Sequence, residues 1–250
     1  MSRDGSSEFL RIGIVGSNGY LGATLMRNLQ KKNVHVYPIG REFLKDETFP
    51  ELDFIIDSGF PRNIHNKNVK MEYFKNLTSR LEHCSSQNTT YLYFGSLSSH
   101  SPATSKYGTA KREAENLVVS MRGRVIRFGL VVDRQEPGGR YLELVKNLRS
   151  FPVILVPHPD YFPICVTYIK EFSGTLDRVI FERENSVSDA TAPIEWTCLS
   201  QLVRNSTDRR VIVLPKFITK ITCEIIRILP LGKLDNLKAI AYKITDPQEN

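Results

Sequence analysis

The chain lacks several features that would place it at once in a specialised class. Its four cysteines are far apart and form no CxxC pair, so neither a structural zinc site nor a disulfide scaffold is expected. The five histidines are equally scattered, and we expect no metal site. No apolar run is long enough to span a bilayer. These absences predict a protein of the reducing cytoplasm without an integral membrane segment.

A secretory signal and a nucleic-acid-binding pattern are lacking too. Residues 1–9, MSRDGSSEF, carry acidic side chains and no apolar core. The net charge is +7, but lysine and arginine are spread along the chain rather than clustered between aromatic residues. The excess charge is either a solvated basic surface or a field that attracts polyanionic small molecules such as dinucleotides. No nucleic-acid partner is expected.

What the sequence does contain is a glycine cluster near its start, in residues 11–22, RIGIVGSNGYLG. Gly16, Gly19 and Gly22 follow the apolar run 12–15, and a helical pattern covers 23–31. A strand, a tight turn and a helix start aim backbone N–H groups and a helix dipole at one point, which suits a pyrophosphate. The spacing is GxxGxxG rather than GxGxxG, and glycine-bearing turns after strands are common. The context of strand and helix therefore supports the motif more than the spacing does.

Strand and helix patterns alternate through the first half of the chain. The expected strands are 34–39, 54–56, 90–94 and 124–128, and the expected helices are 66–86 and 106–121. This order predicts an α/β fold, a Rossmann-like doubly wound parallel sheet with helices on both faces. We expect a dinucleotide-binding domain over 10–135, and a small C-terminal substrate lobe over 136–250 that partly returns to the core sheet.

The residue after the second strand bears on the choice of dinucleotide. A carboxylate there favours NAD, whereas an arginine accommodates the 2′-phosphate of NADP. Arg41 stands at this place, where its fork of donors could hold a phosphate. It could equally be an exposed loop residue, and Glu42 beside it keeps NAD possible.

A second group of residues carries acid–base chemistry. Tyr107 and Lys111 lie four residues apart at the start of the expected helix, hence on one face. An ammonium near a phenol stabilises the phenolate, and such a tyrosine can exchange a proton with an alcohol or carbonyl. Ser96 follows an expected strand, where it could bond the reacting oxygen, or simply belong to a polar loop. YxxxK matches are frequent by chance. The interpretation as a catalytic site therefore depends on the order of the three motifs along the chain: the glycine loop, then the serine, then YxxxK.

In that order the chain resembles the short-chain dehydrogenase/reductase superfamily, in its extended (atypical) branch of NAD(P)-dependent nucleotide-sugar epimerases, dehydratases and reductases. The matching segments cover the first half of the chain: VGSNGYLG (15–22), DFIIDSGF (53–60), YLYFGSLSS (91–99), YGTAKREAE (107–115) and RFGLVVD (127–133). In the second half only ICVTYIKEF (164–172) matches, loosely, as a late strand and helix.

The resemblance implies roles for individual residues. Ser96, Tyr107 and Lys111 would form the catalytic triad: Tyr107 the acid/base, Lys111 the group that holds the nicotinamide ribose and tunes Tyr107, and Ser96 the group that orients the substrate oxygen. The cofactor-binding residues would be Gly16, Asn18, Gly19, Tyr20, Leu21, Gly22, Arg41 and Gly59.

Four departures from the family pattern leave the substrate open, of which the first is the small C-terminal lobe. Gly95 precedes Ser96 where the family often has a second serine, the interval to Tyr107 is short, and Asp57 stands where the family has His or Asn. We expect an NADP-preferring enzyme, with NAD possible, that acts on a carbon bearing oxygen, by reduction or by epimerisation. Its substrate would be a small molecule, a nucleotide sugar in the first instance. The alternative is a dinucleotide-binding regulator or scaffold without turnover.

The C-terminal region 216–243 has apolar residues near helical spacing, among them Ile218 and Ile221. It would form a helix that packs on the core or on a second subunit of a homodimer. A helix on a membrane surface is the other possibility, with Lys220 and Arg227 facing lipid headgroups.

Overall fold

The computed structural model describes residues 9–40, 51–99, 106–136, 138–161, 163–181, 189–191 and 195–228. Arg41 and Glu42 lie outside these residues. The chain forms two compact units that alternate along the sequence. The first contains residues 1–94, 114–126 and 185–190, and the second contains 95–113, 127–184 and 191–250. The domain boundary expected at residue 135 stays a prediction.

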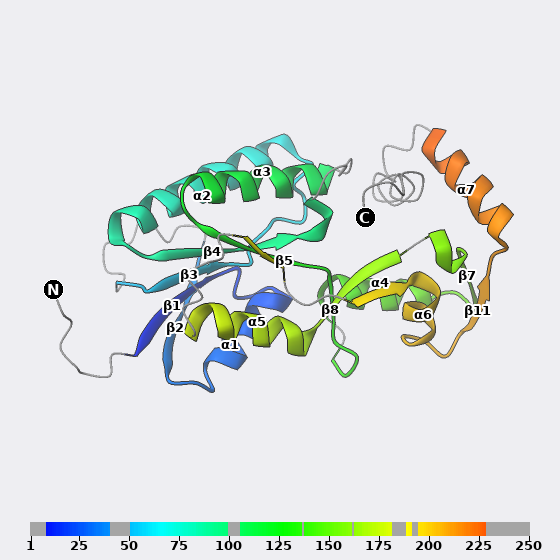
Figure 1. The fold of residues 1–250 in the computed structure, drawn as a ribbon, viewed down its shortest axis with the longest axis horizontal. Helices are drawn as coiled ribbons and strands as arrows, with labels where there is room; N and C mark the ends of the chain where they lie inside the picture. The colour runs from blue at the N-terminus through cyan, green and yellow to red at the C-terminus, as the bar shows by residue number, and fades with distance from the viewer. Residues whose placement is uncertain are drawn as a thin grey trace. The chain divides into compact units, whose positions relative to one another are not determined.

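A six-stranded sheet forms the framework of the first unit, in the order β2-β1-β3-β4-β5-β9. Figure 1 labels its first five strands. Its strands are β1 Leu10–Val15, β2 Val34–Ile39, β3 Phe54–Asp57, β4 Thr90–Ser96, β5 Arg124–Phe128 and β9 Asp189–Thr191. The pairs of β1 with β2, β1 with β3 and β3 with β4 are parallel. Because β2 lies on one side of β1 and β3 on the other, the carboxyl ends of β1 and β3 flank a topological switch point, where open α/β sheets bind ligands.

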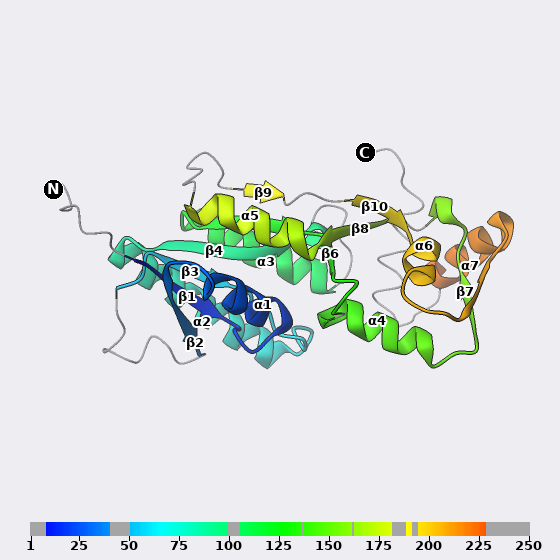
Figure 2. The ribbon, with the colours of Figure 1, turned by 90° about the horizontal axis from the view of Figure 1, so that it is seen from below.

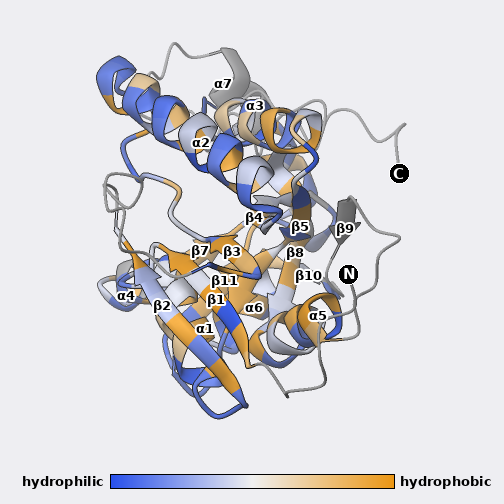
Figure 3. Ribbon diagram, turned by 90° about the vertical axis from the view of Figure 1, so that its left-hand side faces the viewer, coloured by the Kyte–Doolittle hydropathy of each residue, from blue (hydrophilic) through white to orange (hydrophobic). Residues whose placement is uncertain are grey.

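Helices cover both faces of this sheet. They are α1 Tyr20–Leu29, α2 Lys67–Gln87 and the second half of α3 Lys106–Ser120. Within the first unit α1 lies on one face and α2 on the other (Figures 1 and 2). The central strands are largely hydrophobic, whereas α2 carries many hydrophilic residues (Figure 3). All four residues of β3 are buried, which is typical of a parallel strand covered on both sides. The predicted doubly wound α/β fold is confirmed.

Sequence signals fix the ends of α2. The Asn66 side chain accepts hydrogen bonds from the backbone N–H groups of Asn68 (2.9 Å) and Val69 (3.4 Å), as an N-cap does. Asn88 ends the helix in the left-handed conformation, with φ of 56°, which asparagine tolerates better than most residues. The helix expected over 66–86 is confirmed to within one residue at either end.

The second unit contains two small sheets. β8 pairs with β6 in parallel and with β10 in antiparallel, and β7 pairs with β11 in parallel. The strands are β6 Leu130–Val132, β7 Val153–Val156, β8 Pro163–Tyr168, β10 Glu195–Cys198 and β11 Arg210–Val213. The helices are α4 Gly139–Arg149, α5 Ile169–Phe181, α6 Leu199–Arg204 and α7 Lys216–Ile228. β8 and α5 occupy the segment 164–172 in which a late strand and helix are expected.

Candidate functional site

The turn after β1 is shaped for a ligand that approaches its backbone. Gly16 has a φ of +77°, which favours glycine. The Gly19 N–H donates to the Gly16 carbonyl at 2.9 Å, and Gly19 is the N-cap of α1. No side chain caps α1, and its first turn holds no acidic residue. No negative charge in this turn therefore offsets the positive end of the helix dipole. A turn that binds an anion needs this positive end to be available.

Gly16 and Gly22 of this turn are too closely packed to carry a side chain. A Cβ on Gly22 would collide with the Gly16 carbonyl oxygen. A Cβ on Gly16 would lie 2.6 Å from the Cα of Gly59, in the turn after β3. The structure thus brings Gly16, Gly22 and Gly59 together at the switch point between β1 and β3. The result is a cradle with walls of backbone, which is what a dinucleotide pyrophosphate needs.

Asp57, at the end of β3, holds the Gly59 turn in place. Its side chain has no exposed surface. One carboxylate oxygen accepts the Gly59 N–H at 2.8 Å. The other accepts Arg80 Nη2 at 3.0 Å and the Tyr91 hydroxyl, and Arg80 Nε donates to the same hydroxyl at 3.2 Å. A buried ion pair therefore connects the turn to α2.

The protonation of this cluster follows from its burial. Burial lowers the pKa of Arg80, but Asp57 and Tyr91 together raise it above its ordinary value. Burial raises the pKa of Tyr91 well above 10, and Asp57 raises it further. Arg80 therefore stays charged and Tyr91 stays a hydrogen-bond donor to Asp57.

Arg80 is a positioning residue that the sequence analysis missed. The available signal was its spacing, because Tyr73, Leu77 and Arg80 recur every three or four residues along the buried side of α2. An arginine on such a stripe needs a buried acidic partner. In the sequence, Asp57 stands out only as a departure from the family pattern.

In the second unit, Ser96 ends β4 and a short 3₁₀ turn, Leu97–Ser99, follows it. Ser96 Oγ lies 2.6 Å from Ser98 Oγ and accepts the Ser98 N–H at 3.2 Å. Ser99 Oγ donates to the Ser96 carbonyl at 2.6 Å. Arg112 Nε donates to the Ser99 carbonyl at 2.7 Å. The serine turn is therefore fixed to the beginning of α3.

Tyr107 and Lys111 lie one turn apart in the same part of α3. Tyr107 is half-buried rather than sealed in a core. Lys111 is only 5% exposed, which excludes an ordinary solvated lysine. The guanidinium of Arg140, on α4, stands over the Tyr107 ring at 4.7 Å from its centroid. The sequence analysis missed Arg140. That Ser96, Tyr107 and Lys111 converge on one reacting carbon stays a prediction.

One cavity in the second unit has a volume of about 430 Å³. Its lining is Val132, Asp133, Arg134, Gln135, Tyr168, Ile169, Lys170, Glu171 and Glu195. Arg134 donates to the Tyr168 hydroxyl at 3.0 Å. Burial and then a hydrogen bond with Glu195 raise the pKa of Tyr168. No donor in the described part of the chain reaches the buried Oε2 of Glu171. Such a lining suits a ligand rich in hydroxyl groups.

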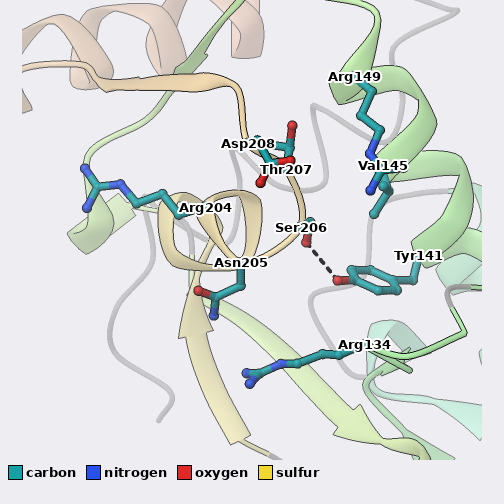
Figure 4. Close-up of a pocket in the computed structure, with 9 residues that line it drawn as sticks. All are labelled: Arg134, Tyr141, Val145, Arg149, Arg204, Asn205, Ser206, Thr207 and Asp208. Carbon is teal, nitrogen blue, oxygen red and sulfur yellow. Dashed lines mark hydrogen bonds between the residues drawn. The ribbon is translucent and has the colours of Figure 1, made fainter.

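A smaller cavity, of about 180 Å³, lies between α4 and the end of α6 (Figure 4). Ser206 donates to the Leu202 carbonyl at 2.5 Å, so the Tyr141 hydroxyl, 2.8 Å away, is the donor to Ser206. Arg134 lines both cavities. Figure 4 shows the Arg204 guanidinium directed away from Tyr141. Asp208 and the carbonyl end of α6 offset part of the positive charge of the three arginines that line this cavity.

Within the described ranges, no three His, Cys, Asp or Glu side chains gather as a metal site would require. The helices of this part of the chain include none that is both long enough and apolar enough to cross a bilayer.

No protein-family model and no curated protein sequence matches this chain. Solved structures do. A dTDP-4-dehydrorhamnose reductase from Clostridium acetobutylicum is 15% identical, with a TM-score of 0.65 over 82% of this chain and 84% of that one. The same enzyme from Bacillus anthracis, in complex with NADP, is 15% identical, with a TM-score of 0.64 over 83% and 84%. The UDP-Glc/GlcNAc 4-epimerase from Campylobacter jejuni is 13% identical, with a TM-score of 0.61 over 83% and 87%. The predicted resemblance is thereby confirmed at the level of the fold.

Proposed function

We propose that this chain is an NAD(P)-dependent enzyme of the extended short-chain dehydrogenase/reductase type, which reduces or epimerises an oxygen-bearing carbon of a nucleotide-activated sugar. The observation that carries the proposal is the backbone cradle of Gly16, Gly22 and Gly59 at the switch point of the sheet. The fold neighbours support it, because they are reductases and an epimerase of nucleotide-linked sugars, one of them in complex with NADP.

The cradle would hold the pyrophosphate through backbone N–H groups. Gly16, Asn18 and Gly19 would supply the turn, and Tyr20, Leu21 and Gly22 the first turn of α1. Asp57 would keep Gly59 in its place against the cofactor. The bound nicotinamide would give or accept a hydride. Every other chemical task falls to residues of the chain.

Tyr107 would move the proton between the substrate oxygen and solvent. The Arg140 cation over its ring, together with Lys111, would stabilise negative charge as it develops on the phenol. With the Ser98 hydroxyl as donor, Ser96 Oγ would accept two hydrogen bonds and direct its own proton to an acceptor such as the substrate oxygen. The polar cavity beside Tyr168 and Glu171 would receive the hydroxyl groups of the sugar.

Replacement of Tyr107 by Phe tests the proposal, since it removes the exchangeable proton and keeps the ring. Turnover should fall by roughly 10²–10⁴-fold, the usual loss when a general acid–base is removed, while the affinity for NADPH hardly changes. Lys111→Met should reduce both. The assay follows nicotinamide absorbance with a panel of nucleotide-linked keto-sugars, and product analysis accompanies it because epimerisation gives no net absorbance change. Tyr37→Phe, on β2, is the matched control.

Full activity in Tyr107→Phe would refute the mechanism. Tight binding of NADP(H) without turnover of any substrate would favour the regulator or scaffold instead.

The choice of dinucleotide is a separate proposal, which depends on Arg41. NADP(H) should bind more tightly than NAD(H), and Arg41→Ala should erode that preference, because the guanidinium would hold the 2′-phosphate. Calorimetric titration of both dinucleotides decides it. Equal or tighter binding of NAD(H) by the unmodified protein would overturn the claim.

A further inference from the structure

The second unit exposes a group of large apolar side chains. Of the eleven exposed large hydrophobic residues in the described ranges, seven belong to β7, β11, α7 or the loop before β7. They are Phe151, Val153, Leu155, Ile212, Phe217, Ile218 and Ile221, hereafter the apolar surface. Leu155 is 63% exposed and Phe217 65%. Single exposed apolar residues are ordinary, but seven on two paired strands, the loop before them and the helix hydrogen-bonded next to them at His158 point to an interaction surface.

The two-stranded sheet contributes one whole face. The register places Leu155 opposite Ile212, and Val153 opposite Arg210. Residues paired in this way share a face, and the alternate residues Ile154 and Val156 are buried with Val203 in a core cluster. One face of the sheet is thus packed, and the other exposes Val153, Leu155 and Ile212 beside Arg210.

α7 contacts the segment after β7 through a polar residue and exposes apolar residues to solvent. Thr219 is 1% exposed and accepts the His158 N–H at 3.0 Å. Phe217 and Ile221, one turn apart on α7, and Ile218 beside them are exposed. A helix of a globular protein normally buries such a stripe.

The charges around the apolar surface indicate which kind of partner it binds. Four exposed basic residues lie on or beside it, Arg209, Arg210, Lys216 and Lys220. Among the side chains that the structure describes in these segments, Asp160 and Asp208 are the exposed acidic ones, and Asp160 pairs with Lys216 at 3.1 Å. A second copy related by a two-fold axis would bring like charges together. An anionic lipid surface would instead attract them, while the apolar side chains enter the headgroup region.

We propose that the apolar surface docks the protein peripherally on an anionic bilayer, with α7 lying in the interface. The inference does not depend on the proposed enzymatic function, since it uses none of the cofactor or catalytic residues.

Flotation of the full chain with lipid vesicles tests the proposal. The protein should bind phosphatidylcholine vesicles that contain phosphatidylserine, and bind pure phosphatidylcholine only weakly. Leu155→Glu combined with Phe217→Glu should lower binding at least tenfold. Lys220→Glu and Arg210→Glu should each lower binding to the anionic vesicles by about fivefold or more, the effect expected for one basic residue near a charged membrane. Met71→Glu is the matched control, because Met71 is 62% exposed on α2 and should leave binding unchanged.

Circular dichroism shows whether the variants fold. If the double variant Leu155→Glu with Phe217→Glu does not fold, the double variant Leu155→Gln with Ile221→Gln takes its place. Failure of the unmodified chain to bind anionic vesicles would overturn the proposal. So would an equal loss in Met71→Glu. A concentration-dependent dimer in light scattering that Phe217→Glu dissociates would assign the surface to a second copy and overturn the proposal as well.

Discussion

At the scale of single residues, Asp57 and Arg80 are the pair on which the Gly59 turn depends. Asp57 satisfies the Gly59 N–H with one oxygen and binds Arg80 with the other. A buried ion pair adds little net stability compared with apolar residues of similar size, but the loss of one partner leaves an uncompensated charge. The main effect of the Asp57–Arg80 pair is therefore to fix the geometry of the Gly59 turn.

Arg80→Leu should destabilise the protein by about 3–5 kcal/mol, because Asp57 would stay buried without its partner. Urea denaturation measures the free energy of unfolding. Lys75→Ala, at an exposed position of the same helix, should change it by no more than about 0.5 kcal/mol. If Arg80→Leu costs no more than this control, the ion pair does not have the role given to it here.

Stability should also fall at alkaline pH. Burial raises the pKa of the Cys84 thiol to about 12 from 9.0, and that of Tyr91 well above 10. Above about pH 9 the unfolded chain releases the thiol proton while the folded chain retains it, so the free energy of unfolding declines as pH rises. Urea titrations between pH 8 and 10.5 measure the slope, which Cys84→Ala should reduce. A stability that is flat or rises over this interval would contradict the burial of these groups.

At the scale of elements, the turn between β1 and α1 requires glycine for packing, whereas a helical glycine in α5 does not. Gly22→Ala should destabilise the protein by about 1–3 kcal/mol, since its methyl group would press on the Gly16 carbonyl. Gly174→Ala should stabilise it by roughly 0.5–1 kcal/mol, because nothing lies within 4 Å of the added carbon and alanine is the better helix former. Thermal or urea unfolding compares the two. Equal effects would mean that the turn is looser than described.

The elements of the first unit could be predicted because each has a local cause. The β-branched runs of β1 and β3, the Asn66 cap of α2 and the glycine cluster all act within a few residues. The periodicity of α2 indicates that Arg80 is buried, but its partner Asp57 could not be predicted, since the two are 23 residues apart and meet only when α2 packs on β3. Periodicity in the sequence predicts the apolar stripe of α7, but not whether this stripe faces the core or solvent. Packing on the core was one expectation for this helix, yet Ile218 and Ile221 are exposed and Thr219 is buried.

At the scale of the whole molecule, the two units contain different parts of the proposed enzyme. The first contains the glycine cradle, and the second contains Ser96, Tyr107, Lys111 and the polar cavity. The fold is shared with enzymes of 13–15% sequence identity. At so low a sequence identity the backbone cradle can persist while the residues that contact the substrate change. A binding experiment with the cofactor can therefore be made before the substrate is known.

The most direct measurement is a calorimetric titration of the unmodified chain, Gly22→Ala and Gly174→Ala with NADPH and NADH. The account predicts saturable binding of NADPH by the unmodified chain, affinity weakened about tenfold or more in Gly22→Ala, and affinity unchanged in Gly174→Ala. Absence of saturable binding for both dinucleotides, or equal affinity in all three proteins, would contradict the assignment of the glycine turn as a dinucleotide site.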